Sequence, residues 1–187
     1  MLNEALRNQA AHYVAGTLSA DERESFEVLL EAREDLREHV RSLQEVVATM
    51  TLADRPTATP PPGLKNRLMD TLQQRPRNPS PECLVVTDAT GRVEWVNAAF
   101  IAMCGHDLGE IKGRKPGQVL QGPETDAAAV ARIRAALAAR EPCHETLVNY
   151  HKDGSPYRVD VRINPILDED GAPLQFVARE RKLPDPA

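Results

Sequence analysis

The stretch GRKPGQVLQGPETD, residues 113–126, decides how the second half of this chain is interpreted. It ends on Thr125 and Asp126, either of which can begin the next helix, because a side-chain oxygen satisfies a free amide at a helix start. That helix is the longest of this half, and its inward-facing residues have helical spacing: Val130, Ile133 and Leu137. Before the stretch, Asn97 caps a shorter helix that ends at Gly105.

Sequences typical of strands lie on both sides of these helices. Residues 84–87 and 93–96 predict a hairpin around the turn Asp88-Ala-Thr-Gly91. Three more strands are expected, at residues 143–151, 156–167 and 174–183. The second of them alternates apolar and polar side chains, which predicts one buried and one wet sheet face: Tyr157, Val159, Val161 and Ile163 against Arg158, Asp160, Arg162 and Asn164. The fold class is therefore α+β, with a five-stranded antiparallel sheet that holds a helical clamp.

The first part of the chain has helical periods instead. Helices are expected at residues 2–15, after the capping box Ser19-Ala-Asp-Glu22, and at about 35–52. Proline-rich sequence then isolates a short amphipathic helix, which must dock on something because proline breaks the amide ladder on both sides. The expected divisions are a helical core at 1–54, a spacer at 55–63, a docking helix at 64–73, a linker at 74–81, a strand-rich domain at 82–183 and a tail at 184–187.

Composition excludes several classes of function. The net charge of -5 argues against a nucleic-acid surface. No window of about 18 apolar residues is present, so no membrane span is expected, and the N-terminus does not resemble a signal peptide. Three cysteines without a C-x-x-C pair fit a reducing cytoplasm and predict no metal site. No nucleophile–base pair, phosphate loop or kinase block is found, so the chain is not expected to be an enzyme.

Three segments, in the right order, resemble a PAS sensor domain of the subgroup that includes the flavin-binding LOV photoreceptors: VVTDATGRVEWVNAAF (85–100), LQGPETD (120–126) and NYHKDGSPY (149–157). The resemblance covers about residues 81–183 and implies a domain that detects a signal. LOV photochemistry uses a cysteine within Asn-Cys-Arg-Phe-Leu-Gln. The matching stretch here is Lys115-Pro-Gly-Gln-Val-Leu-Gln121, without that cysteine, so adduct formation with flavin is not expected.

The same resemblance implies a set of ligand contacts. Gln121 and Asn149 match polar contacts to the flavin ring, and Arg134 matches a phosphate-binding arginine; Trp95 could stack on a ligand, although a strand tryptophan is more often part of a core. Val159 and Glu180 depart from the LOV pattern, where asparagine and glutamine are usual. A redox-sensing flavin stays open as the cofactor, as does no cofactor at all. Haem is disfavoured because the long helix contains no histidine.

Residues 5–73 resemble the anti-sigma domain of bacterial factors that control extracytoplasmic-function sigma factors, through AAHYVAGTLSADERESFEVLLEAREDLREHV (10–40) and PPPGLKNRLMDTL (60–72). In that family three helices and a detached fourth wrap the sigma factor. The zinc-binding branch has its ligands at positions that are Leu29, Arg33 and Leu36 here, so zinc is not expected. The resemblance implies that the docking helix contacts sigma through Leu64, Leu68, Met69 and Leu72.

The resulting hypothesis is a cytoplasmic anti-sigma factor whose grip on a sigma factor is regulated by a PAS domain. The alternative is a PAS signalling adaptor whose N-terminal helices mediate dimerisation or bind another signalling protein; a homodimer through either the PAS domain or the N-terminal helices stays open. The sequence leaves open whether the two parts of the chain touch.

Overall fold

The structure is a computed structural model that describes residues 2–52 and 82–184. Three helices come first: α1 (Glu4–Ala15), α2 (Ala20–Ala32) and α3 (Glu34–Leu52). The second described range begins with β1 (Cys83–Asp88) and β2 (Val93–Val96), followed by α5 (Ala98–Cys104), α6 (Leu108–Ile111), α7 (Gly117–Leu120) and α8 (Ala127–Ala139). Three strands complete it: β3 (Cys143–Tyr150), β4 (Pro156–Leu167) and β5 (Pro173–Lys182).

The five strands form one antiparallel sheet in the order β2-β1-β5-β4-β3. This confirms the predicted α+β class and five-stranded sheet, with strand ends within one residue of expectation. The last strand lies at the centre, paired with the first strand on one side and with β4 on the other. Because β5 is central, its side chains face both layers that cover the sheet.

Helix ends follow the capping residues. The Asn3 side chain accepts a hydrogen bond from the Leu6 amide, so α1 begins two residues later than the expected residue 2. Ser19 and Glu22 form the predicted capping box of α2. Asn97 caps α5, and Asp126 caps α8 by accepting from the Ala128 amide.

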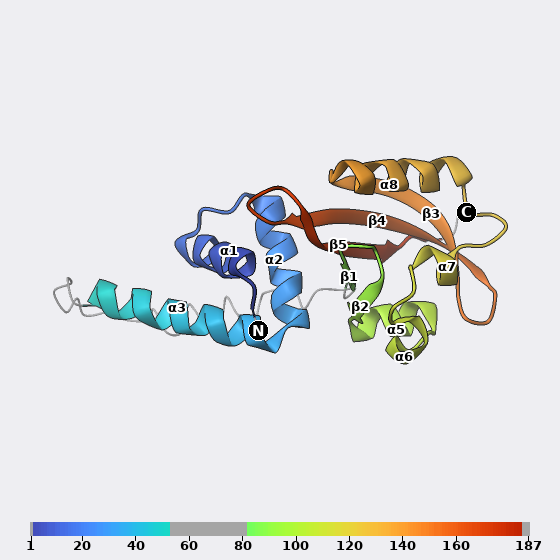
Figure 1. The fold of residues 1–187 in the computed structure, drawn as a ribbon. Coiled ribbons are helices and arrows are strands. Elements are labelled where there is room, and N and C mark those ends of the chain that lie inside the picture. Colours follow the sequence, from blue (N-terminus) through green and yellow to red (C-terminus); the bar gives the residue numbers. More distant parts are fainter. Residues whose placement is uncertain (1, 53–81, 185–187) are drawn as a thin grey trace.

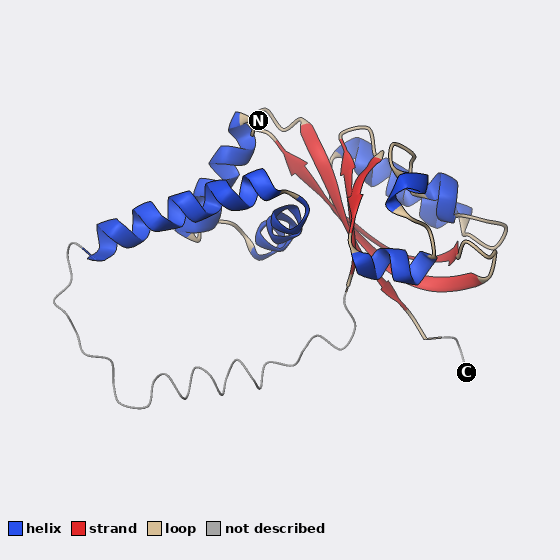
Figure 2. Ribbon diagram, turned by 90° about the horizontal axis from the view of Figure 1, so that it is seen from below, coloured by secondary structure: helices blue, strands red, loops and turns tan. Residues whose placement is uncertain are grey.

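Two hydrophobic layers cover the sheet, and the alternation along β1 shows which residues face which layer. Cys83 and Val85 pack with Phe100 and Cys104 of α5 on the inner side. Leu84 and Val86 point the other way and share a cluster with the N-terminal helices, together with Ile166 and Val177. In Figure 2 the strands lie between the N-terminal helices and helices α5–α8.

The two parts of the chain therefore touch, which the sequence left open. Phe26 and Leu29 of α2 are fully buried in the cluster that includes Val86 and Val177 of the sheet. The sheet face that was predicted to be solvent-exposed is thus only partly exposed. Arg158 and Arg162 of β4 are exposed, whereas Asn164 further along the same strand donates a hydrogen bond to the Ser25 hydroxyl (3.0 Å). The outer face is covered where α2 crosses it because β1 and β5 carry apolar side chains there.

The third helix is packed at its start and exposed at its end. Leu36 and Val40 are buried beside α1 and α2, but Val46 and Met50 are exposed. Figure 1 shows this end of α3 extending away from the sheet. None of the helices in the described ranges has the length and apolar character needed to cross a membrane.

The predicted spacer at 55–63, docking helix at 64–73 and linker at 74–81 lie outside the described residues. The same holds for the expected sigma contacts Leu64, Leu68, Met69 and Leu72, which stay predictions.

Candidate ligand-binding pocket

A cavity of about 590 Å³ lies between the inner face of the sheet and the layer that contains α7 and α8. Ligand pockets typically measure roughly 300–1,000 Å³, so this volume suits a small organic molecule. Most of its wall is apolar and comes from every layer around it, including Val85, Leu120, Val130, Ile133, Leu147 and Val161. Such a lining favours a largely apolar ligand.

Three buried polar side chains interrupt this apolar lining, and one of them, Thr87, has its hydroxyl bonded to the Asp88 carbonyl oxygen. Asn149 of β3 and Glu180 of β5 line the cavity and are 3% and 5% exposed. Within the described part of the chain, Asn149 Oδ1 and Glu180 Oε2 have no hydrogen-bond partner. A buried polar atom without a partner costs about 1–3 kcal/mol, so these atoms are the ones that a ligand would satisfy.

Glu180 occupies a strongly desolvated position. It pairs with Cys83 of β1 and Val161 of β4 in the sheet, and its burial raises the pKa of the carboxyl group to about 7. Desolvation is the cause, because burial disfavours the charged form. Burial likewise raises the pKa of the nearby Cys83 thiol to about 12, and raises the pKa of the Tyr157 hydroxyl.

The mouth of the cavity is cationic. Arg134 of α8 and Lys115 line it, and both are exposed. Gln121, just after α7, also lines the cavity, and its side chain packs against Gly117 so closely that an added Cβ there would lie 2.7 Å from Gln121 Nε2. The pocket thus combines a positive rim with an apolar body and two buried polar atoms that have no partner in the described ranges.

Three of the four ligand residues expected from sequence meet in this cavity: Gln121, Arg134 and Asn149. The fourth, Trp95, is a correction. It packs against the cluster formed with the N-terminal helices, on the opposite side of the sheet. The physical reason is strand alternation, since its neighbour Val96 faces the inner layer and Trp95 must then face outward. Trp95 is a partly buried residue that packs against the core, which was the alternative interpretation of this strand tryptophan.

Sequence reasoning treated Glu180 only as a departure from the LOV pattern and missed it as a pocket residue. The signal was the alternation along β5: Phe176, Ala178 and Glu180 share one face, and all three line the cavity. An acidic residue that shares one face of a central strand with two apolar residues indicates a buried carboxyl group.

No cysteine in the described ranges lines the cavity. Cys83 is buried, and its Sγ lies 3.5 Å from Met103 Sδ. Its high pKa keeps it protonated, and a protonated thiol is a poor nucleophile. The absence of adduct photochemistry stays a prediction.

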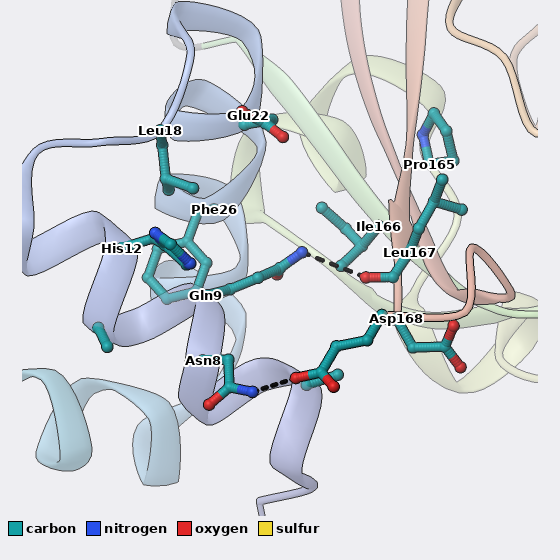
Figure 3. Close-up of a pocket in the computed structure, with 13 residues that line it drawn as sticks. Asn8, Gln9, His12, Leu18, Glu22, Phe26, Pro165, Ile166, Leu167 and Asp168 are labelled. Atoms are coloured by element: carbon teal, nitrogen blue, oxygen red, sulfur yellow. Dashed lines mark hydrogen bonds between the residues drawn. The ribbon is translucent and has the colours of Figure 1, made fainter.

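A second cavity of about 440 Å³ lies where α1 and α2 meet the connection between β4 and β5. Gln9 Nε2 donates to the Leu167 carbonyl oxygen (3.3 Å), and the Asn8 amide donates to the Glu169 carboxylate (Figure 3). Arg179 of β5 adds a third connection, donating to the Glu24 carbonyl oxygen of α2 at 2.6 Å. The second cavity thus lies at an interface made of polar contacts as well as apolar packing.

Comparison with known proteins places residues 81–180 within the family described as the PAS domain. The chain is 35% identical over 102 residues to phototropin-2 of Oryza sativa, covering 53% of this chain and 11% of that protein. It is also 35% identical over 105 residues to blue-light-activated histidine kinase 1 of Erythrobacter litoralis, covering 56% of this chain and 27% of the kinase. The chain therefore spans about a quarter or less of these relatives.

The chain is also similar to solved structures of LOV domains. The LOV domain of a blue-light-activated histidine kinase from Erythrobacter litoralis superimposes with a TM-score of 0.53 at 30% identity, covering 56% of this chain and 98% of that domain. The light-state structure of the Aureochrome1 LOV domain matches with a TM-score of 0.53 at 29% identity, covering 55% and 82% of the two chains.

These relatives contradict the expectation that the chain is not an enzyme. Blue-light-activated histidine kinases from Erythrobacter litoralis, Rhizobium johnstonii and Brucella ovis share this domain at 32–36% identity. The expectation rested on the lack of catalytic motifs along the chain. That reasoning was too strong, because a sensor domain carries no catalytic residues even where it belongs to an enzyme.

Proposed function

The chain belongs to the PAS domain family, and we propose that its cavity binds a flavin as part of a signal sensor. The observation that carries the proposal is the combination of two unpartnered buried polar atoms with a cationic rim around one apolar cavity. An isoalloxazine ring is flat and apolar on its faces, polar along one edge, and continues into a phosphate-bearing tail in flavin mononucleotide. Each part has a matching region in the pocket.

Different residues of the cavity would contact different parts of the flavin. Asn149 Oδ1 would accept a hydrogen bond from a ring N–H, and Gln121 would contact the polar edge beside it. Arg134 at the mouth would pair with the phosphate, where solvent exposure suits a charged group. The apolar walls would exclude water from the ring faces. Bound flavin would supply a reducible ring, and the chain's part is to hold and orient it.

Purified protein with flavin mononucleotide tests this proposal. We expect saturable binding, seen as quenching of flavin fluorescence. Asn149→Leu should weaken binding at least tenfold, because it removes the hydrogen bond at a desolvated site. Asn164→Leu is a matched control, since Asn164 is on the same sheet but bonds to Ser25 on the outer face. Equal affinity of the Asn149 variant and the wild-type protein would contradict the assigned site.

The output is the second part of the proposal: the N-terminal helices bind a sigma factor, and the sensor regulates that binding. Its support is the resemblance of residues 5–73 to anti-sigma domains, together with the exposed apolar side chains Val46 and Met50 at the end of α3. Exposed large apolar residues grouped on one helix end are typical of protein interfaces. Signal transfer would use β5, whose Glu180 faces the cavity while Arg179 contacts α2.

Co-purification with extracytoplasmic-function sigma factors from a bacterial host tests the output. A stoichiometric sigma factor is the expected partner, and Met50→Asp should weaken its capture by placing a charge in an apolar contact. Gln44→Asp is the control, because it adds the same charge at another exposed position of α3. Recovery of the protein alone as a dimer, or with a different signalling protein, would overturn the sigma assignment in favour of the adaptor.

A further inference from the structure

The carboxyl group of Glu180 is buried in the described structure without a charged partner. It is 5% exposed, lies on the central strand and lines the ligand cavity, and one of its oxygens has no partner. No cation in the described ranges forms an ion pair with it; Lys182, two residues along β5, has its Nζ 5.6 Å from the centroid of the Tyr157 ring. The lysine and arginine of the cavity, Lys115 and Arg134, are exposed at the mouth.

Other titratable groups near Glu180 come from three neighbouring elements. They are Cys83 of β1, Tyr157 of β4 and Cys104 of α5, and each interacts electrostatically with Glu180. Burial raises the pKa of all three. They stay neutral below about pH 8, so Glu180 is the member of this group that changes charge near neutral pH.

A ligand in the cavity would desolvate Glu180 further. Water that enters the cavity solvates the ionised carboxylate, and a ring that fills the cavity displaces that water. The polar edge of an oxidised isoalloxazine also offers carbonyl oxygens and unprotonated ring nitrogens, which are acceptors. A carboxylate repels such atoms, whereas a carboxylic acid donates to them. Both effects favour the protonated form.

We propose, on the basis of the proposed flavin site, that ligand binding is coupled to the uptake of one proton by Glu180. A neutral ring with a hydrogen-bond acceptor edge then binds well only when the Glu180 carboxyl group is protonated. Affinity is full at acidic pH and falls as the pH rises above that at which Glu180 ionises in the free protein. A glutamine at this position would donate to the same acceptors at every pH.

Riboflavin is the probe that tests this coupling, because it lacks the phosphate that titrates near pH 6. Calorimetric titrations of the full chain at pH 8, in buffers of different ionisation enthalpy, count the protons that accompany binding. The wild-type protein should take up close to one proton, and Glu180→Gln none. The affinity of the wild-type protein for riboflavin should fall about tenfold per pH unit between pH 7.5 and 8.5, while the affinity of Glu180→Gln stays constant.

Glu141→Gln is the matched control, since Glu141 is exposed in the loop after α8. It should behave as the wild-type protein does. Riboflavin binding without proton uptake, or equal uptake by wild type and Glu180→Gln, overturns the coupling and leaves the flavin site standing. No riboflavin or flavin mononucleotide binding by either protein between pH 5.5 and 8.5 overturns the flavin site itself. Should the variant not fold, a ¹³C NMR titration of the wild-type carboxyl groups with and without riboflavin identifies the proton acceptor.

Discussion

Glu180 also makes the stability of the protein depend on pH. Its pKa in the folded state is about 7, above the ordinary value of 4.5, so the folded state binds this proton more tightly than the unfolded state. The resulting stabilisation is complete below pH 4.5 and is lost as the pH rises through 7. The loss is about 3 kcal/mol, from 1.36 kcal/mol per pKa unit.

Replacing Glu180 by glutamine should remove this loss. We expect the free energy of unfolding of Glu180→Gln to exceed that of the wild-type protein by up to about 3 kcal/mol at pH 8, with little difference at pH 4.5. Urea denaturation at several pH values measures it. A variant that is less stable than the wild-type protein at pH 8 would show that the carboxylate has a partner in the folded state.

The resemblance to LOV domains placed three residues that the structure brings together around one cavity, and their contact with a ligand stays a prediction. Gln121, Arg134 and Asn149 meet in one cavity. Trp95 failed because the segment around it carried no clear alternation: Val93, Trp95 and Val96 are all apolar, so the outward residue was not evident. The environment of Glu180 depends on what covers both faces of the central strand, which the local sequence does not state.

At the scale of elements, the helix that joins the two parts is α2. Its Phe26 is 1% exposed, stacks near Tyr13 of α1 with ring centroids 5.0 Å apart, and belongs to the cluster that includes the outer face of the sheet. Removing the ring would leave a cavity at the centre of the interface, since close-packed interiors relax only partially.

Phe26→Ala should therefore lower the free energy of unfolding by about 3–5 kcal/mol. Val46→Ala is the control, because Val46 is 55% exposed on α3 and should change the free energy by less than about 0.5 kcal/mol. Thermal and urea denaturation of both variants give the comparison. A cost for Phe26→Ala as small as that of the control would mean that α2 does not pack as described.

The helices α1, α2, α5 and α8 followed from periodicity and capping residues, whereas α6 and α7 were not predicted and helix docking did not follow from the sequence. The periods of α1 and α2 show which residues are apolar, not which surface they meet. The signal for docking lay in β1, whose run Cys-Leu-Val-Val-Thr is buried at every position. A run without polar alternation is typical of a strand covered on both faces.

At the scale of the whole molecule, the described residues form three layers: the N-terminal helices, the sheet, and the layer of helices α5–α8 (Figure 2). The ligand pocket and the interface with α2 lie on opposite faces of the same strands. Glu180 and Arg179 are adjacent on β5, and one lines the cavity while the other bonds to α2. A change at the pocket therefore has a short structural route to the helices, provided that two arrangements of that interface exist.

Hydrogen–deuterium exchange of the full chain, with and without saturating flavin mononucleotide, tests this account most directly. It predicts slower exchange in β3 and α8 around the cavity, together with a change in α2 on the opposite face of the sheet. Protection confined to the cavity would support the ligand site and contradict transfer of the signal to the helices. Identical exchange throughout the chain would contradict the sensor account as a whole.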